Sequence, residues 1–244
     1  MTPPPALWPD GPGAGAVTRN SQSGVAAQSR YHSQLNMSSH LATISADEAL
    51  QRLIEGNERF RNGTTRWDRV TVASLTTLAD GQQPYATILG CSDSRVPPEL
   101  VFDTGLGELF VVRVAGNVFS GEVAGTLQYA GIHLGTPLIV VLGHSGCGAI
   151  GAALEARRSG ATHGSIHLLV ESVLPALEDV DPLLPLDAQM LMAVEHNVRW
   201  TLRQIAQTEQ GRQRLREGQL KLVGGIYEMA TGRVHWLTDG APVT

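Results

Sequence analysis

The stretch Pro137-Leu-Ile-Val-Val-Leu142, followed at once by Gly143-His144-Ser-Gly-Cys147, decides the fold. Consecutive apolar residues between a proline and a glycine are typical of a short strand buried on both faces, as in a parallel sheet. The His-x-x-Cys pair then comes directly after a buried strand. We expect it at the carboxyl edge of the sheet, where open parallel sheets place their ligands.

A second apolar run has the same arrangement. Tyr85-Ala-Thr-Ile-Leu89 lies between Pro84 and Gly90, and Cys91-Ser-Asp93-Ser-Arg95 follows it. This pattern predicts another parallel strand with polar groups at its carboxyl end. Parallel pairing of the two strands would bring both motifs, and with them the only two cysteines of the chain, to one sheet edge.

The rest of the chain alternates between helical and strand patterns. A capping-box pattern at Ser45 predicts a helix that ends at Asn62-Gly63. We expect further helices over 75–78, 121–135, 149–158 and 187–207, and strands over 109–114, 220–229 and 234–237. In the longest helix, we expect one apolar face made of Leu191, Val194, Val198, Leu202 and Ile205. The alternation predicts an α/β fold, a single domain with a mainly parallel β-sheet flanked by helices and an N-terminal helical arm.

Length, composition and charge limit the class of protein. The 244 residues, 42% of them apolar, suffice for one domain with a sizeable core. We expect a disordered tail over 1–40, with Met37 as an alternative start, and the folded domain over 41–244. The formal net charge of −5 argues against a nucleic-acid partner. No apolar run reaches the ~18 residues that span a membrane. The amino terminus lacks a signal-peptide pattern, so we expect a cytoplasmic protein.

The two motifs together offer a set of zinc ligands. Cys91, His144 and Cys147 would leave one tetrahedral position, which either water or Asp93 could fill. If Arg95 holds Asp93 in a bidentate pair, the position stays open and a zinc-bound water can ionise near neutral pH. Other interpretations remain open: two buried apolar thiols, a metal-free Cys–His nucleophile or redox protein, and a non-catalytic zinc module.

The chain resembles the β-class carbonic anhydrases from about residue 45 to 238. The resemblance rests on Cys91-Ser-Asp-Ser-Arg-Val96, Phe110-Val-Val-Arg113, Ala115-Gly-Asn117, Gln128-Tyr129 and Gly143-His-Ser-Gly-Cys-Gly148. It implies that Zn2+ is bound by Cys91, His144 and Cys147. It also implies that Asp93 accepts a hydrogen bond from zinc-bound hydroxide, that Arg95 holds Asp93, and that the reaction is reversible hydration of CO2 to bicarbonate and a proton.

The resemblance also implies a substrate pocket and an assembly. Gln82, Phe110 and Tyr129 match substrate-binding positions of the plant-like branch. Ile88 stands where another branch has a tryptophan in an inhibitory bicarbonate site, although Arg113 matches the arginine of that site. We therefore expect the open, plant-like form and give Arg113 a structural or interface role. The same scaffold could hydrolyse carbonyl sulfide or carbon disulfide. The family further implies a homodimer or homotetramer in which N-terminal helices wrap the partner, although the apolar face of the first helix could instead pack on its own domain.

Overall fold

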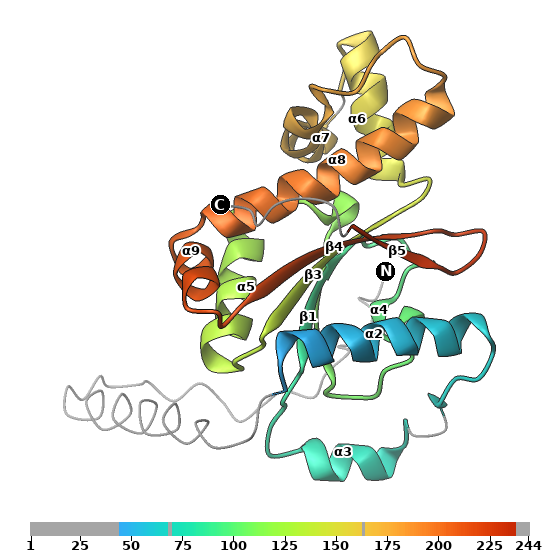
Figure 1. The fold of residues 1–244 in the computed structure, drawn as a ribbon. Helices are drawn as coiled ribbons and strands as arrows, with labels where there is room; N and C mark the ends of the chain where they lie inside the picture. Colours follow the sequence, from blue (N-terminus) through green and yellow to red (C-terminus); the bar gives the residue numbers. More distant parts are fainter. Residues whose placement is uncertain (1–43, 68–69, 163, 238–244) are drawn as a thin grey trace, which may run out of the picture. The chain divides into compact units, whose positions relative to one another are not determined.

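The computed structural model describes residues 44–67, 70–162 and 164–237 (Figure 1). Its centre is a five-stranded sheet in the order β2-β1-β3-β4-β5. The first four strands are parallel, and β5 pairs antiparallel with β4. The strands are β1 (Ala86–Gly90), β2 (Leu109–Arg113), β3 (Leu138–His144), β4 (Lys221–Tyr227) and β5 (Val234–Leu237). The disordered tail predicted for residues 1–40 lies outside the described residues.

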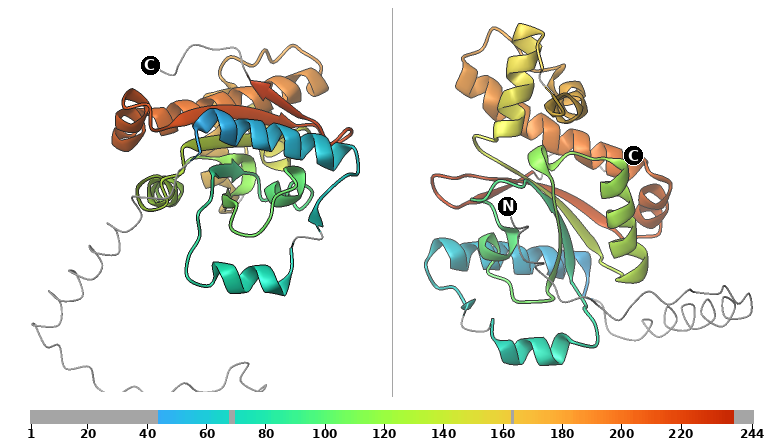
Figure 2. Two further views of the ribbon diagram at one scale, coloured as in Figure 1. Left: turned by 60° about the horizontal axis from the view of Figure 1, so that its bottom comes forward. Right: turned by 180° about the vertical axis from the view of Figure 1, so that it is seen from behind.

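Helices cover both faces of the sheet (Figures 1 and 2). One face carries α2 (Ala46–Arg61) and α4 (Pro98–Val101), and the other carries α5 (Gly121–His133) and the long α8 (Leu186–Gln207). The remaining helical segments are α3 (Val72–Leu78), η3 (Ala115–Asn117), α6 (Gly148–Ser159), α7 (Ile166–Val173), η4 (Leu174–Leu177) and α9 (Glu209–Arg216). The predicted α/β architecture is confirmed. None of the helices in the described parts of the chain is long and apolar enough to span a lipid bilayer.

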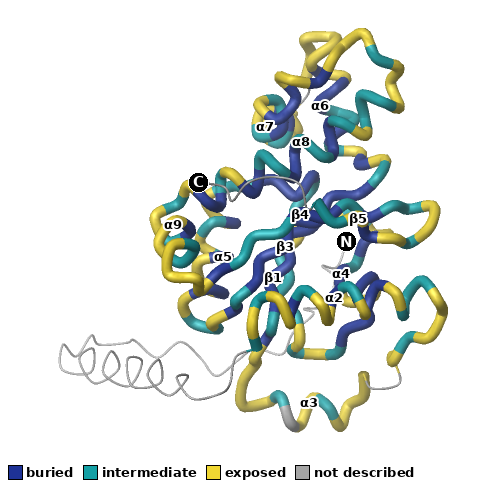
Figure 3. Tube along the Cα trace, viewed as in Figure 1, coloured by how far each residue is buried: buried dark blue, intermediate teal, exposed yellow. Residues whose placement is uncertain are grey.

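The two strands that decide the fold are buried along their whole length, as their apolar runs predict. Every residue of β1 and β3 is buried, and Figure 3 shows this buried layer between exposed helix surfaces. The predicted end of β3 was wrong, because the strand continues through Gly143 to His144. A Cβ atom at Gly143 would lie 2.7 Å from Cγ2 of Val198. This glycine therefore lets α8 approach the strand and does not end it.

Helix α2 packs on the sheet of its own chain. Ser45 caps it by accepting a hydrogen bond from the Glu48 amide, and it ends at Asn62. Ala49 and Leu53 are fully buried against residues of β1, β3 and α4. The buried part of this apolar face therefore belongs to the core of its own chain.

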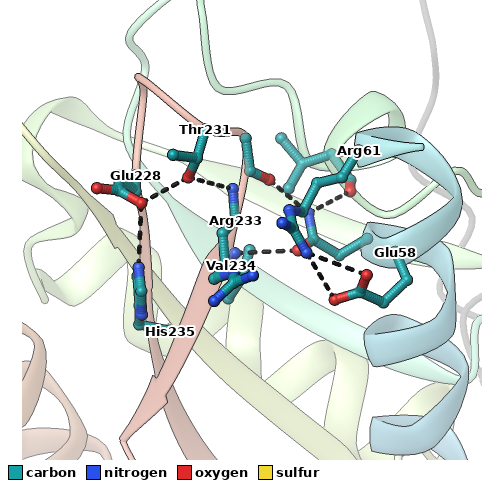
Figure 4. Close-up of polar contacts among 10 residues, drawn as sticks. Glu58, Arg61, Glu228, Thr231, Arg233, Val234 and His235 are labelled. Atoms are coloured by element: carbon teal, nitrogen blue, oxygen red, sulfur yellow. Dashed lines mark hydrogen bonds and ion pairs between the residues drawn. The ribbon is translucent and has the colours of Figure 1, made fainter. Parts of the chain in front are cut away.

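A buried amide fixes the position of α2. Asn57 donates hydrogen bonds to the carbonyl oxygens of Val101 (3.1 Å) and Gly232 (2.9 Å). Its own oxygen accepts from the Val234 amide at 3.0 Å. Figure 4 shows Val234 on β5 together with Glu58 and Arg61 of α2. One side chain thus connects α2 to α4 and to the turn between β4 and β5.

Helix α8 departs from its predicted apolar face at one end. Val194, Val198, Leu202 and Ile205 are buried as expected, but Leu191 is 63% exposed. The first turns of α8 extend beyond the sheet and pack on α6 and η4 through Met190 and Ala193. The buried face is therefore set there by a different partner, which turns Leu191 towards solvent.

Candidate metal centre

Cys91, His144 and Cys147 come together at the carboxyl edge of the sheet. Strands β1 and β3 are parallel neighbours with Gly90 opposite Leu142, which places the residues after both strands side by side. One ligand atom from each of the three side chains lies within 4.8 Å of the others, and all three side chains are buried. The predicted meeting of the two motifs is confirmed.

The geometry of this cluster fits a tetrahedral zinc ion. The Sγ atoms of Cys91 and Cys147 are 3.9 Å apart, and two zinc–sulfur bonds of about 2.3 Å at a tetrahedral angle require about 3.8 Å. Nδ1 of His144 lies 3.1 Å from the Ser145 carbonyl oxygen, to which it donates in the tautomer with its proton on Nδ1. Nε2 of His144 is buried and has no hydrogen-bond partner among the described residues. A metal ion would satisfy that nitrogen, and the hydrogen bond at Nδ1 would orient the ring.

The two thiols are hydrogen-bonded to each other, and this contact shifts their pKa values in opposite directions. The hydrogen bond with Cys147 lowers the pKa of Cys91 to about 4, against the effect of burial, and the neighbouring His144 side chain and the amides of Asp93 and Gly116 lower it further. The same hydrogen bond, together with burial, raises the pKa of Cys147. One proton therefore leaves easily and the second with difficulty. A divalent cation between the sulfurs would offset the second charge.

Asp93 and Arg95 form a bidentate ion pair beside the cluster. Nε and Nη2 of Arg95 lie 2.9 and 2.8 Å from the two carboxylate oxygens, and the Arg95 amide adds a bond of 2.9 Å. These hydrogen bonds hold the pKa of Asp93 well below its usual range. The carboxylate is not among the mutually close ligand atoms found in the described part of the chain.

Arg113 supports the metal-binding loop from the end of β2. Its Nε donates to the Cys91 carbonyl oxygen at 3.0 Å, and its Nη2 donates to the Asp93 carbonyl oxygen at 2.5 Å. The expectation of a structural role is confirmed. Ile88, at the position of the inhibitory tryptophan of another branch, is fully buried in β1.

The proposed substrate residues Gln82, Phe110 and Tyr129 lie away from this cluster. Gln82 precedes β1, and Phe110 pairs with Thr87 near the start of that strand. Since each residue of a strand adds about 3.3 Å, Phe110 lies about 10 Å below the level of Arg113. The Tyr129 ring is 43% exposed and its centroid is 6.1 Å from that of Phe110. One copy of the chain therefore does not bring these residues to its own metal centre.

Gly116 contributes to the centre through its backbone, which the sequence analysis missed. Its amide donates to the Sγ atom of Cys91 at 3.3 Å. The available signal was the Ala115-Gly-Asn117 motif, which carried part of the resemblance without a residue role. The donor is a backbone N–H, which every residue except proline has, so no residue type in the sequence indicates this hydrogen bond.

A buried Cys-His-Cys set at the carboxyl edge of a parallel sheet defines a zinc-type metalloprotein. A family model described as carbonic anhydrase matches residues 86–234. Carbonic anhydrase 2 of Mycobacterium tuberculosis is 41% identical over 188 residues, which are 76% of this chain and 89% of the relative. Carbonic anhydrase of Pseudomonas aeruginosa is 37% identical over 175 residues, 67% of this chain and 77% of the relative.

Solved structures with a similar fold belong to the same family as these relatives. The β-carbonic anhydrase CcaA superposes with a TM-score of 0.62 at 30% identity, covering 77% of this chain and 94% of that chain. A tetrameric β-carbonic anhydrase of Sordaria macrospora shares the fold with a TM-score of 0.63 at 21% identity, covering 91% and 98%. The chain belongs to the β class of the carbonic anhydrase family, whose members interconvert CO2 and bicarbonate.

Proposed function

We propose that this chain binds Zn2+ through Cys91, His144 and Cys147 and hydrates CO2 reversibly at that ion. The observation that carries the proposal is the buried, unpartnered Nε2 of His144 beside two sulfurs 3.9 Å apart. When bound, zinc lowers the pKa of a coordinated water and so supplies a nucleophile near neutral pH.

Asp93 and Arg95 are the catalytic pair in this proposal. Arg95 holds both carboxylate oxygens of Asp93, which favours a metal with an open fourth position and the plant-like form of the site. Because its pKa is depressed, Asp93 stays ionised and can only accept hydrogen bonds. Its carboxylate would accept the O–H of the attacking water and orient the oxygen lone pair towards CO2.

The substrate-binding role of Gln82, Phe110 and Tyr129 requires a second copy of the chain. These residues lie towards the amino edge of the sheet, whereas the metal ligands lie at its carboxyl edge. A homodimer in which each copy supplies these residues to the other copy's metal would complete two sites, and a tetramer would pair such dimers. The exposed ring of Tyr129 and its half-buried neighbour Phe110 support this arrangement.

The ligands also constrain where the protein works. Both thiols must stay reduced to coordinate a metal, and oxidation would remove two of three ligands. We infer a reducing compartment, consistent with the cytoplasmic expectation.

The test measures bound metal and CO2 hydration in the same preparations. We expect one zinc per chain by elemental analysis and hydration by stopped-flow indicator assay. His144→Asn should lose both, whereas His167→Asn, which changes an exposed histidine, should keep both. Protein without stoichiometric zinc would contradict the metal site. Full zinc with turnover of carbonyl sulfide but not CO2 would contradict the assigned substrate.

A further inference from the structure

Helix α8 contacts chain segments on both sides of the metal ligands. On one side, Val194 and Val198 pack against Gly143, directly before the ligand His144. On the other side, two buried polar side chains of the same helix bind the η3 segment: Asn197 and Thr201 donate to backbone carbonyl oxygens there. Figure 1 shows α8 running across this face of the sheet.

The η3 segment carries an amide that reaches the metal ligands. Gly116 has a φ of +67°, and its N–H donates to the Cys91 sulfur. A Cβ atom at this position would lie 3.1 Å from that of Ala149, a tight contact, and the positive φ would strain any residue other than glycine. Glycine also permits many other backbone conformations, and an amide carried by it needs an external contact to hold its direction.

Asn197 supplies that contact. Its Nδ2 donates to the Gly116 carbonyl oxygen at 2.8 Å, and the residue is 1% exposed. Its Oδ1 is buried without a hydrogen-bond partner in the described ranges. A buried side-chain amide whose oxygen lacks a hydrogen-bond partner costs stability that a leucine of similar shape would avoid. Its presence is explained if the bond to Gly116 serves the site and not the core.

We propose that Asn197 is a positioning residue of the metal centre: by fixing Gly116, it keeps the Gly116 amide directed at the Cys91 sulfur. The inference rests on the zinc site proposed above. An N–H···S hydrogen bond withdraws charge from a thiolate and orients it, so losing the bond changes both the donor strength of the sulfur and the rate at which metal leaves.

The test compares two changes on α8, each of which replaces a buried polar side chain by an apolar one of similar shape. Asn197→Leu removes the donor to Gly116, and Thr201→Val removes the neighbouring buried donor to Asn117, 3.2 Å away in the native protein. In cobalt-substituted enzyme, we expect Asn197→Leu to move the thiolate-to-cobalt absorption band to longer wavelength. We also expect zinc transfer to a chromogenic chelator to become about 10-fold faster. Thr201→Val should leave the band and the transfer rate as in wild type, although both variants lose a buried hydrogen bond.

Three outcomes would overturn the proposal. An unchanged cobalt band in Asn197→Leu would refute the role of Asn197 while leaving the zinc site intact. Equal band shifts in both variants would mean that any lost hydrogen bond between α8 and η3 loosens the site, without a specific role for Asn197. The third is independent of variant folding. In cadmium-113-substituted wild type, NMR should show scalar coupling between the metal and the Gly116 amide proton, and absence of that coupling would refute the link. A wild type without any thiolate–cobalt band would instead refute the metal site itself.

Discussion

At the scale of single residues, the metal centre consists of three ligand side chains and of the backbone contacts that hold them in place. Cysteine and histidine directly after buried strands are a strong signal, and Cys91, His144 and Cys147 meet as expected. Gly116 and Asn197 act through backbone atoms, and a glycine or a helical asparagine has many other uses. Only the three-dimensional contact between α8 and η3 reveals their role.

The Asp93–Arg95 pair leads to a prediction at this scale. Arg95→Gln removes the bidentate clamp, so Asp93 can turn towards the metal or away from the reacting water. We expect kcat/KM for CO2 hydration to fall about 100-fold through lost orientation. Bound zinc should stay stoichiometric, because Arg95 is 60% exposed and ligates nothing. Stopped-flow assays and metal analysis measure both.

Arg158→Gln is the matched control, since Arg158 is an exposed arginine paired with Glu155 on α6. It should leave kcat/KM unchanged. An Arg95→Gln enzyme with wild-type turnover would show that the clamp has no part in catalysis.

At the scale of elements, the long and strongly patterned segments were predictable. Apolar runs predicted β1 and β3, and a helical stripe of apolar residues predicted α5. The structure contains all three. α4 is only four residues long and α9 (EQGRQRLR) has one leucine, so neither shows an apolar period. The placement of α2 against its own sheet depends on the long-range bonds of Asn57, which no local pattern contains.

Asn57 allows a test of how α2 is held. Asn57→Ala leaves two carbonyl oxygens and one amide without their hydrogen-bond partner. We expect the free energy of unfolding to fall by about 3 kcal/mol. Gln51→Ala, which removes an exposed amide from the same helix, should cost less than about 0.5 kcal/mol. Urea denaturation compares the two, and equal losses would mean that the buried bonds do not hold α2.

Asp103 makes the attachment of α2 dependent on pH. Its side chain is 1% exposed and lies 2.5 Å from Nε of Arg59, and its other oxygen accepts from the Arg66 amide. Burial opposes its ionisation, but these hydrogen bonds outweigh burial and lower its pKa. A carboxyl whose pKa is lower in the folded state stabilises above its unfolded pKa of about 4, and this contribution is lost as pH falls through the folded value.

We therefore expect Asp103→Asn to lower the free energy of unfolding by about 2 kcal/mol at pH 7. The difference from wild type should shrink as the pH falls below about 4. Asp47→Asn, on α2, breaks an exposed pair with Lys221 and should cost less than about 0.5 kcal/mol at any pH. A difference between wild type and Asp103→Asn that stays constant from pH 7 to 3 would contradict the role of this carboxylate.

At the scale of the whole molecule, the proposed site crosses between two copies, and mixing variants can show it. Cys147→Ser should bind no zinc, and Gln82→Leu should bind zinc but turn over slowly. In a mixed dimer, the Gln82→Leu copy supplies an intact metal centre and the Cys147→Ser copy supplies an intact Gln82. One of the two sites is then complete.

Random reassociation after mild denaturation makes half of the dimers mixed, so a one-to-one mixture should recover about a quarter of wild-type activity. Neither variant alone gains activity by the same treatment, and that serves as the control. Mixing Cys147→Ser with His144→Asn should recover nothing, because both changes damage the metal centre of their own copy. No recovery in the first mixture would mean that each copy completes its own site, and recovery in the second would mean that one metal centre takes its ligands from both copies.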